Sequence, residues 1–279
     1  MNARPVVLFT DFGIRDFYAG VMRAVIAAAS PASRVVDLQH DIPAHDIASA
    51  SFVLARSWEY LPPDAVVLVV VDPGVGSERR GLVVRLGDRV LVGPDNGFAS
   101  DLLLAAGAAD TGAEKPDFFM IEPGLARREI GVEPRGATFH GRDIFAPVAA
   151  AIARGAAPSA FGDPIEGIVM LRGVPSVSID SGRVHGAARY VDHFGNLLTD
   201  IPVAVIRRVF GDRARVRVTA DDRDLGPLRN TYAQGRPGEL MALVNSWGLV
   251  EAAVNGGRAI DHFAGAPPTA IRFVIHAGS

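Results

Sequence analysis

The fold is decided by residues 66–80, which read Val66-Val67-Leu68-Val69-Val70-Val71-Asp72-Pro73-Gly74-Val75-Gly76-Ser77-Glu78-Arg79-Arg80. A β-branched apolar run of strand length ends in an aspartate and then breaks on Pro-Gly. Such a run is typical of a buried parallel strand that brings a carboxylate to the carboxyl edge of a sheet, where open α/β folds bind ligands. The next turn carries two arginines. The aspartate and an arginine of this turn therefore form either a structural ion pair or the polar half of an active site. The rest of the sequence favours an active site.

The composition is that of a soluble globular protein. A chain of 279 residues is long enough for two domains with sizeable cores. The net charge of -3 predicts no basic face, so nucleic acid is not an expected partner. The absence of cysteine excludes disulfides, thiolate metal sites and a cysteine nucleophile. We find neither a signal-peptide pattern nor an apolar run of about 18 residues, so we expect a cytoplasmic protein without a membrane span.

Strand and helix patterns alternate over residues 1–173, which predicts an α/β domain with a mostly parallel sheet and flanking helices. The expected strands are Arg4–Thr10, Val35–Leu38, Val66–Val71, Leu82–Leu86, Arg89–Val92 and Asp117–Glu122. The expected helices are Asp16–Ala29, Asp46–Tyr60, Ala99–Ala106 and Ile144–Arg154. We expect Asp16 and Asp46 to cap their helices. The expected apolar face of the first helix consists of Phe17, Val21, Ala24 and Val25.

The pattern changes after Gly173. Val174–Ser176 reads as a linker, and helical periodicity largely disappears beyond it. Short strands are expected at Val184–Val191, Arg213–Val218, Leu240–Asn245 and Ile271–Ile275. Residues 174–279 are therefore predicted to form a smaller β-barrel-like domain.

Two polar turns join Asp72 at the predicted sheet edge. Asp11 closes the first strand, and a carboxylate at that position either accepts hydrogen bonds from ribose hydroxyls or forms a turn. Asn96 follows another strand within Gly93-Pro94-Asp95-Asn96-Gly97, where it either points an amide into the site or only shapes the turn.

His140 lies in Thr138-Phe139-His140-Gly141-Arg142-Asp143, directly before a helix. It is either a core histidine or a proton carrier poised near neutral pH. The second interpretation gains support because Asp72, Arg79 and His140 fall on one predicted rim. The pairs His40-Asp41 and His45-Asp46 do not favour a metal site, because a five-residue separation does not place two histidines on one helical face. The P-loop, the dinucleotide fingerprint and the nucleophile elbow are all absent from the sequence.

The second domain carries groups suited to a small planar ligand. In Asp192-His193-Phe194-Gly195-Asn196, Phe194 either stacks on a base or joins the core, and Asn196 offers an amide that reads a base. A second cluster supplies hydroxyl, indole, carboxylate and main-chain groups. Its members are Ser246, Trp247, Glu251 and Gly256. Ser246 and Glu251 together suit a zwitterion, the hydroxyl for its carboxylate and the acid for its ammonium.

These segments, in order, resemble the S-adenosyl-L-methionine (SAM) hydroxide adenosyltransferase family, which is related to the fluorinase and chlorinase enzymes. The resemblance covers nearly the whole chain and rests on LFTDFG, VDPGVGSERR, GPDNGF, TFHGRDIFAP, DHFGN and NSWG. It implies a catalytic triad of Asp72, Arg79 and His140. It also implies substrate contacts from Asp11, Asn96, Asp192, Phe194, Asn196, Ser246, Trp247, Glu251 and Gly256.

The resemblance implies hydrolysis of SAM to adenosine and L-methionine, without metal or organic cofactor, in a homotrimer whose sites are shared between subunits. The halogenating relatives carry a different segment at Asp72 and Arg79, which favours water over halide as the nucleophile. They also carry an arginine where this chain has Trp247, so their contacts to the methionine part do not carry over directly to this chain. Two alternatives stay open from the sequence: halide-dependent SAM cleavage, and a non-catalytic module that binds SAM or a nucleoside.

Overall fold

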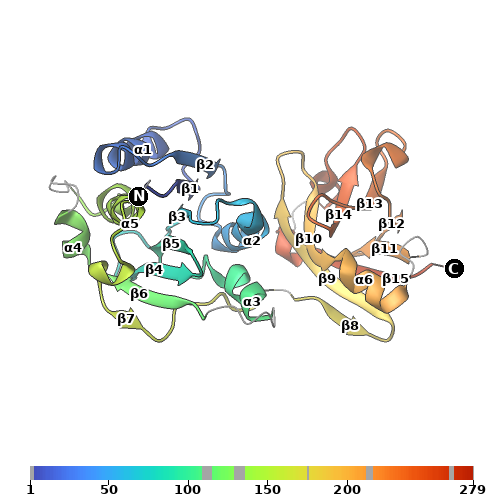
Figure 1. The fold of residues 1–279 in the computed structure, drawn as a ribbon. Coiled ribbons are helices and arrows are strands. Elements are labelled where there is room, and N and C mark those ends of the chain that lie inside the picture. Colours follow the sequence, from blue (N-terminus) through green and yellow to red (C-terminus); the bar gives the residue numbers. More distant parts are fainter. Residues whose placement is uncertain are drawn as a thin grey trace. The chain divides into compact units, whose positions relative to one another are not determined.

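The structure of the protein is a computed structural model that describes residues 3–108, 115–128, 136–174, 176–211, 216–263 and 267–278. The chain forms two compact units, Met1–Arg172 and Gly173–Ser279, each with its own core (Figure 1).

A seven-stranded sheet of order β2-β1-β3-β5-β4-β6-β7 forms the centre of the N-terminal unit. Its strands are β1 (Val6–Thr10), β2 (Val35–Gln39), β3 (Val66–Val70), β4 (Gly81–Leu86), β5 (Arg89–Pro94), β6 (Asp117–Ile121) and β7 (Pro164–Ile165). The pairs from β2 to β5 are parallel, whereas β4, β6 and β7 pair antiparallel. The direction reverses at the predicted hairpin between β4 and β5, where two residues leave no room for a crossover. The predicted α/β class is confirmed.

Helices cover both faces of this sheet (Figure 1). They are α1 (Tyr18–Ala29), α2 (Ile47–Ser57), α3 (Ser100–Ala108), α4 (Pro123–Arg128) and α5 (Ala146–Ala153), with short turns η1 (Trp58–Tyr60), η2 (Gly141–Phe145, a π-helix) and η3 (Pro158–Phe161). Val6 and Leu8 of β1 belong to the core that contains α1 and α5. Val7 and Phe9 are equally buried and point to the opposite face, because side chains alternate along a strand.

The first helix differs from its prediction in two respects. Phe17, not Asp16, occupies its N-cap position, and no side chain caps it. The buried residues are Ala19, Met22 and Ile26, so the expected face was rotated by about one residue. Met22 and Ile26 are the larger apolar side chains spaced to reach the sheet, which leaves Phe17 66% exposed. The Asp46 cap is confirmed, since its Oδ1 accepts from the Ser49 amide at 2.9 Å.

The C-terminal unit is an antiparallel sheet of order β12-β11-β15-β9-β10-β14-β13, with β8 paired to β9. Its strands are β8 (Ser178–Asp180), β9 (Arg183–Val191), β10 (Leu197–Pro202), β11 (Val216–Ala220), β12 (Arg223–Pro227), β13 (Leu240–Val244), β14 (Leu249–Val254) and β15 (Arg272–Ala277). Beyond β12, the Arg229 amide donates to Ala242 of β13 at 2.9 Å. The two ends of the sheet therefore meet, and the barrel-like prediction is confirmed.

In this unit the sequence patterns missed β8, β10, β12 and β14, and also the helix α6 (Val203–Phe210). In β14 a charged residue, Glu251, interrupts an otherwise apolar strand. The short turns of this unit are η5 (Tyr232–Gln234), η6 (Ala259–Phe263) and η7 (Pro268–Ala270). Arg213, the expected start of β11, lies outside the described residues. Within the described part of the chain, no helix has both the length and the apolar character to cross a membrane.

Candidate active site

The parallel register of β1 and β3 brings two carboxylates to one edge of the sheet. Thr10 pairs with Val70, so Asp11 and Asp72 leave the sheet close to the same level. Both line a cavity of about 200 Å³ in the N-terminal unit, and His140 lines it from the segment before η2. Asp72 and His140, two of the three residues predicted to share a rim, therefore line one cavity, with Asp11 beside them.

A chain of charge-assisted hydrogen bonds connects Asp72, Arg79 and His140. Arg79 Nε donates to Asp72 Oδ1 at 2.7 Å, and Arg79 Nη2 donates to Asp72 Oδ2, which makes the pair bidentate. Arg79 Nη2 also lies 2.8 Å from His140 Nδ1. A guanidinium only donates, so Nδ1 accepts and the proton of the neutral ring is on Nε2. The pair thus fixes the tautomer of His140.

The backbone and an aromatic ring hold Arg79 in this position. A Cβ on Gly74 would lie 3.1 Å from Arg79 Cγ, so the glycine leaves room for the arginine to fold back onto Asp72. The guanidinium carbon lies 5.1 Å from the centre of the Phe145 ring, within the range of a cation–π contact. Side-chain exposures of 12% for Arg79 and 5% for Asp72 leave little bulk water to weaken the pair.

The neighbouring Arg80 belongs to a different ion pair. Its Nη2 lies 2.5 Å from Asp95 Oδ2, and Asp95 Oδ1 accepts from the Val169 amide at 2.7 Å. The Asp95 side chain is only 1% exposed. Of the two adjacent arginines, Arg79 therefore contacts two residues that line the cavity, Asp72 and His140, and Arg80 ties the chain around Asp95 together.

Asp11 is fixed by the loop opposite it. Its Oδ2 accepts from the His45 amide at 2.8 Å, and His45 has a φ of 67°, a left-handed value that is uncommon for a residue other than glycine. His45 also lines the cavity. Strained backbone of this kind occurs most often at functional sites.

Asn96 uses its amide within the protein. Its Nδ2 donates to the carbonyl of Val71 at 2.8 Å, and its Oδ1 accepts from the Phe98 amide at 3.3 Å. The contact to Val71 fixes the peptide that precedes Asp72. Asn96 therefore supports the orientation of Asp72 from the turn after β5.

Two histidines, His40 and His45, were considered as metal ligands. His45 lies on the loop that contacts Asp11, and His40 is held by two hydrogen bonds of its ring. His40 is 5% exposed, with Nδ1 at 2.8 Å from Thr10 Oγ1 and Nε2 at 3.0 Å from Asp37 Oδ1. Among the described residues, no three His, Cys, Asp or Glu side chains group as metal ligands.

A second cavity, of about 490 Å³, lies within the C-terminal unit. Its lining includes Phe194, Asn196, Tyr232, Gly256 and Arg258. Phe194 is 71% exposed, so its ring is available as a stacking surface. Asn196 is held by Asp192, whose Oδ2 accepts from Asn196 Nδ2 at 2.9 Å and whose Oδ1 accepts from the Asn196 amide at 2.9 Å.

Glu251 lies behind this lining rather than in it. It is 3% exposed on β14, and the Tyr232 hydroxyl donates to its Oε1 at 2.7 Å. Burial raises the pKa of Glu251, and burial together with the contact to Glu251 raises the pKa of Tyr232. Ser246 and Trp247 lie in the exposed turn between β13 and β14.

Sequence reasoning did not single out Tyr232 or Arg258. The spacing Thr231-Tyr232-Ala233-Gln234 is that of a capping box, which the structure contains. That signal predicts the turn at η5, but not that its tyrosine faces a cavity. The pairing of η5 with β14 depends on barrel closure, which local sequence does not encode.

Together these features define a two-unit protein, with an acid–guanidinium–imidazole triad at the edge of an α/β sheet and an aromatic-lined cavity in a β-barrel. The family model of the SAM hydroxide adenosyltransferase N-terminal domain matches residues 6–162, and that of the C-terminal domain matches residues 186–272. The chain belongs to the SAM hydroxide adenosyltransferase family.

Similar proteins extend over nearly the whole chain. A protein from Salinispora tropica named (R)-S-adenosyl-L-methionine hydrolase is 37% identical and aligns over 94% of both chains. A protein of the same name from Thermus thermophilus is 38% identical over 92% of this chain and 94% of its own. The crystal structure of a conserved protein from Thermotoga maritima has a TM-score of 0.84 at 31% identity, covering 97% of this chain and 99% of that one.

Proposed function

We propose that this protein hydrolyses SAM to adenosine and L-methionine. The single observation that carries the proposal is the Asp72–Arg79–His140 chain of hydrogen bonds beside the N-terminal cavity. Membership of the family and the name (R)-S-adenosyl-L-methionine hydrolase, which its 36–38% identical relatives carry, support the same substrate.

In the proposed reaction a water oxygen attacks C5′ of the ribose as the C5′–S bond breaks. The electron pair of that bond goes to sulfur, so the sulfonium leaves as the neutral thioether of methionine and needs no acid. One proton of the water is released, which balances the reaction. The difficulty lies in the nucleophile, because water is weak and hydroxide is scarce near neutral pH.

The triad addresses that difficulty. The guanidinium of Arg79 supplies positive charge, and the Nε2 proton of His140 is the donor that we assign to the attacking oxygen. Asp72 fixes Arg79 through both carboxylate oxygens, each of which keeps a lone pair able to receive the proton of the water. Once that proton has left, the oxygen is hydroxide-like and carries negative charge, which fixed donors in a site with little water stabilise more than solvent does.

The substrate contacts complete the proposal. We assign the ribose hydroxyls to Asp11 and the base to Phe194 and Asn196, with Asp192 orienting Asn196 and Gly256 giving main-chain access. The hydroxyl of Ser246, next to Trp247, is assigned to the methionine carboxylate. Asn96 acts through the peptide before Asp72.

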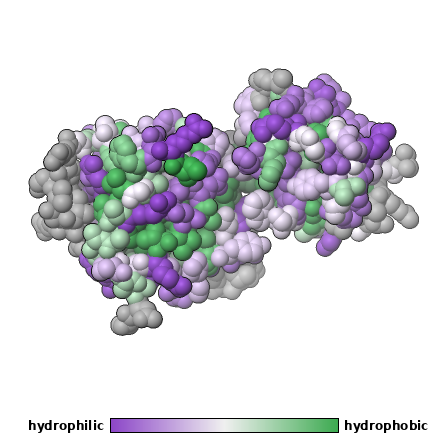
Figure 2. Space-filling model, turned by 90° about the horizontal axis from the view of Figure 1, so that it is seen from above, coloured by the Kyte–Doolittle hydropathy of each residue, from purple (hydrophilic) through white to green (hydrophobic). Residues whose placement is uncertain are grey.

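We further propose a cytoplasmic homotrimer in which one subunit supplies the triad and another the base-binding groups. Exposed apolar side chains of the N-terminal unit support an interface: Ile14 is 74% exposed, Phe17 66% and Tyr18 38%. Figure 2 shows apolar residues gathered on one face of this unit. Light scattering on active enzyme tests the assembly, and a fully active monomer would contradict shared sites.

The test of the reaction is product analysis by chromatography with both sulfur epimers of SAM, since the relatives are named for the R form. We expect adenosine and methionine in equal amounts, unchanged by a chelator or by halide. A halogenated nucleoside that appears only with halide would indicate halide-dependent cleavage. Tight binding without turnover would indicate a binding module, and loss of activity on chelation with rescue by zinc would refute the metal-free mechanism.

A further inference from the structure

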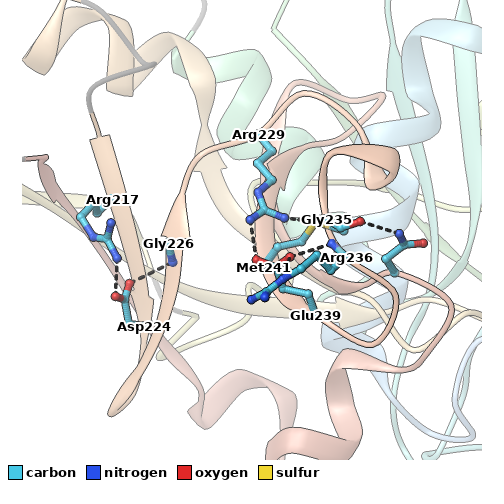
Figure 3. A network of polar contacts seen from close by, with 9 residues as sticks. Arg217, Asp224, Gly226, Arg229, Gly235, Arg236, Glu239 and Met241 are labelled. Carbon is cyan, nitrogen blue, oxygen red and sulfur yellow. Dashed lines mark hydrogen bonds and ion pairs between the residues drawn. The ribbon is translucent and has the colours of Figure 1, made fainter.

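The loop between β12 and β13 presents Tyr232 to the C-terminal cavity. It leaves the barrel at Arg229 and returns at Glu239, and these two residues form an ion pair, with Arg229 Nη2 at 2.5 Å from Glu239 Oε1 (Figure 3). Their side chains are 16% and 25% exposed, so the pair is partly shielded from solvent. The loop is therefore closed at its neck by a charged contact.

Further hydrogen bonds tighten the neck. Glu239 Oε2 accepts from the Arg236 amide at 2.7 Å, and Asn255 Nδ2 donates to the Gly235 carbonyl at 2.7 Å (Figure 3). A Cβ on Gly235 would lie 2.7 Å from Arg229 Nη1 and 2.7 Å from Met241 Sδ. The guanidinium thus lies tightly against the loop backbone, and only a glycine fits there without a shift.

The tip of the loop has further contacts, which act together with the closed neck. Its η5 turn carries the capping box of Thr231 and Gln234, and the Tyr232 hydroxyl donates to the buried Glu251 of β14. The ring is therefore held at its hydroxyl by the barrel and at its backbone by the closed loop. An aromatic wall fixed before a ligand arrives avoids the loss of conformational freedom that would otherwise oppose binding.

We propose that Arg229 and Glu239 are positioning residues for substrate binding, whose ion pair closes the 230–238 loop and holds Tyr232 as a preformed wall of the nucleoside cavity. Glu251 serves the same end as a hydrogen-bond acceptor for Tyr232, rather than as a direct partner of the methionine ammonium. The inference rests on the proposed function, because it takes the ligand of this cavity to be the nucleoside part of SAM.

A matched pair of variants tests it. Glu239→Gln removes the charge of a carboxylate that contacts the Arg229 guanidinium and the Arg236 main-chain amide, with the exposed Arg236 guanidinium 3.7 Å away. Asp224→Asn does the same on the hairpin of β11 and β12, where Asp224 pairs with Arg217 and accepts from the Gly226 amide at 2.9 Å (Figure 3). Both variants keep an oxygen for the amide.

We expect Glu239→Gln to raise the Kd of adenosine and the KM of SAM about 3- to 10-fold, the range for one side chain left to be ordered on binding, with kcat unchanged. Amide hydrogen exchange in residues 230–238 should accelerate. Asp224→Asn should leave binding and exchange in that loop as in the wild type. In a Tyr232→Ala background, Glu239→Gln should have no further effect on the Kd, because the two residues act through one wall.

The proposal is overturned if folded Glu239→Gln binds adenosine and exchanges its loop amides like the wild type, or if its effect is undiminished in the Tyr232→Ala background. A fall in kcat alone would also overturn it. Failure of the proposed function looks different, since wild-type protein would then not cleave SAM, whether or not it binds adenosine. The exchange measurement still decides in that case whether the ion pair orders the loop.

Discussion

The two cavities of this protein differ in the side chains that line them. In the N-terminal cavity the groups lie on turns that leave a buried sheet, and the Asp72 side chain is 5% exposed. In the C-terminal cavity the lining includes the rings of Phe194 and Tyr232, the amide of Asn196, two glycines and Arg258, with the carboxylate of Glu251 behind it. Two carboxylates, Asp11 and Asp72, thus line the first cavity, whereas the lining described for the second contains an arginine and an exposed stacking ring.

This difference has a functional consequence. Groups held by charge-assisted bonds in a shielded place act most strongly on an atom whose charge changes during the reaction. A stacking ring and an amide bind substrate and transition state about equally, so they act on affinity. Variants in the first cavity should therefore lower kcat, and variants in the second should raise KM.

The largest effect is expected for the triad. Asp72→Ala, Arg79→Lys and His140→Ala should each lower kcat on the order of 10²–10³-fold, the range for a charge-stabilising donor or general base. Lysine keeps the charge but loses the bidentate contact to Asp72 and the donor to His140. The effects should be non-additive if, as proposed, all three residues act on one oxygen. Steady-state kinetics on single and double variants measure this.

Arg80→Lys is the matched control for Arg79→Lys. Arg80 is paired with the buried Asp95, so its replacement should lower the melting temperature and leave kcat close to the wild-type value. If Arg79→Lys behaves in the same way, the Asp72–Arg79 pair is structural and the contrast between the two cavities fails.

The second effect concerns Asp11, which belongs to the first cavity but is assigned to binding. Asp11→Ala should weaken adenosine binding by about 2–4 kcal/mol, the order expected for the loss of two ribose hydrogen bonds. Calorimetry with adenosine measures it. The control is Asp46→Ala, which removes the cap of α2 one residue after His45 and should cost about 1 kcal/mol of stability. Unchanged affinity in folded Asp11→Ala would exclude the ribose role.

The sequence predicted the N-terminal unit better than the C-terminal one for a physical reason. Parallel strands buried on both faces appear as continuous apolar runs, and the polar residue after each run marks the sheet edge. Asp11 and Asp72 were found in this way. His140 required the additional observation that it precedes a helix, and its tautomer emerged only from the contact to Arg79.

In the barrel, local sequence carries less of the information. Glu251 interrupts the apolar pattern of β14, so the local sequence does not predict a strand there. Its partner, Tyr232, comes from a loop 19 residues away in sequence. The predictions of an Asp16 cap and of the buried face of α1 were wrong for a related reason. Packing against the sheet, rather than the pattern of the helix alone, decides which row of side chains is buried.

The third effect tests the second cavity directly. Phe194→Ala should raise KM by the loss of base stacking, about 1–3 kcal/mol, and change kcat little. The ring is 71% exposed, so the melting temperature should barely move. Tyr60→Ala, at 69% exposure in the N-terminal unit, controls for the loss of an exposed aromatic ring. A fall in kcat as large as in the triad variants would remove the distinction between chemistry and recognition.

The smallest effects are expected in the pH dependence of stability. Two carboxyl groups of the C-terminal unit, Glu239 and Glu251, should change it in opposite directions. The hydrogen bond from Arg229, followed by the Arg236 amide, lowers the pKa of Glu239 from 4.5 to about 2. A lowered pKa contributes stability that is present above 4.5 and is lost as the pH falls towards 2. Burial raises the pKa of Glu251, so its contribution has the opposite sign: it is present at low pH and is lost as the pH rises through the raised value.

Melting temperatures of wild type, Glu239→Gln and Glu251→Gln, recorded from neutral pH down to the acid limit of folding, test this contrast. As the solution is acidified, the wild type should lose stability relative to Glu239→Gln. Over the same pH range, the wild type should gain stability relative to Glu251→Gln. Parallel changes in both comparisons would mean that Glu251 is not held in a protein interior. Tyr232 would then lack the fixed acceptor on which its place in the cavity depends.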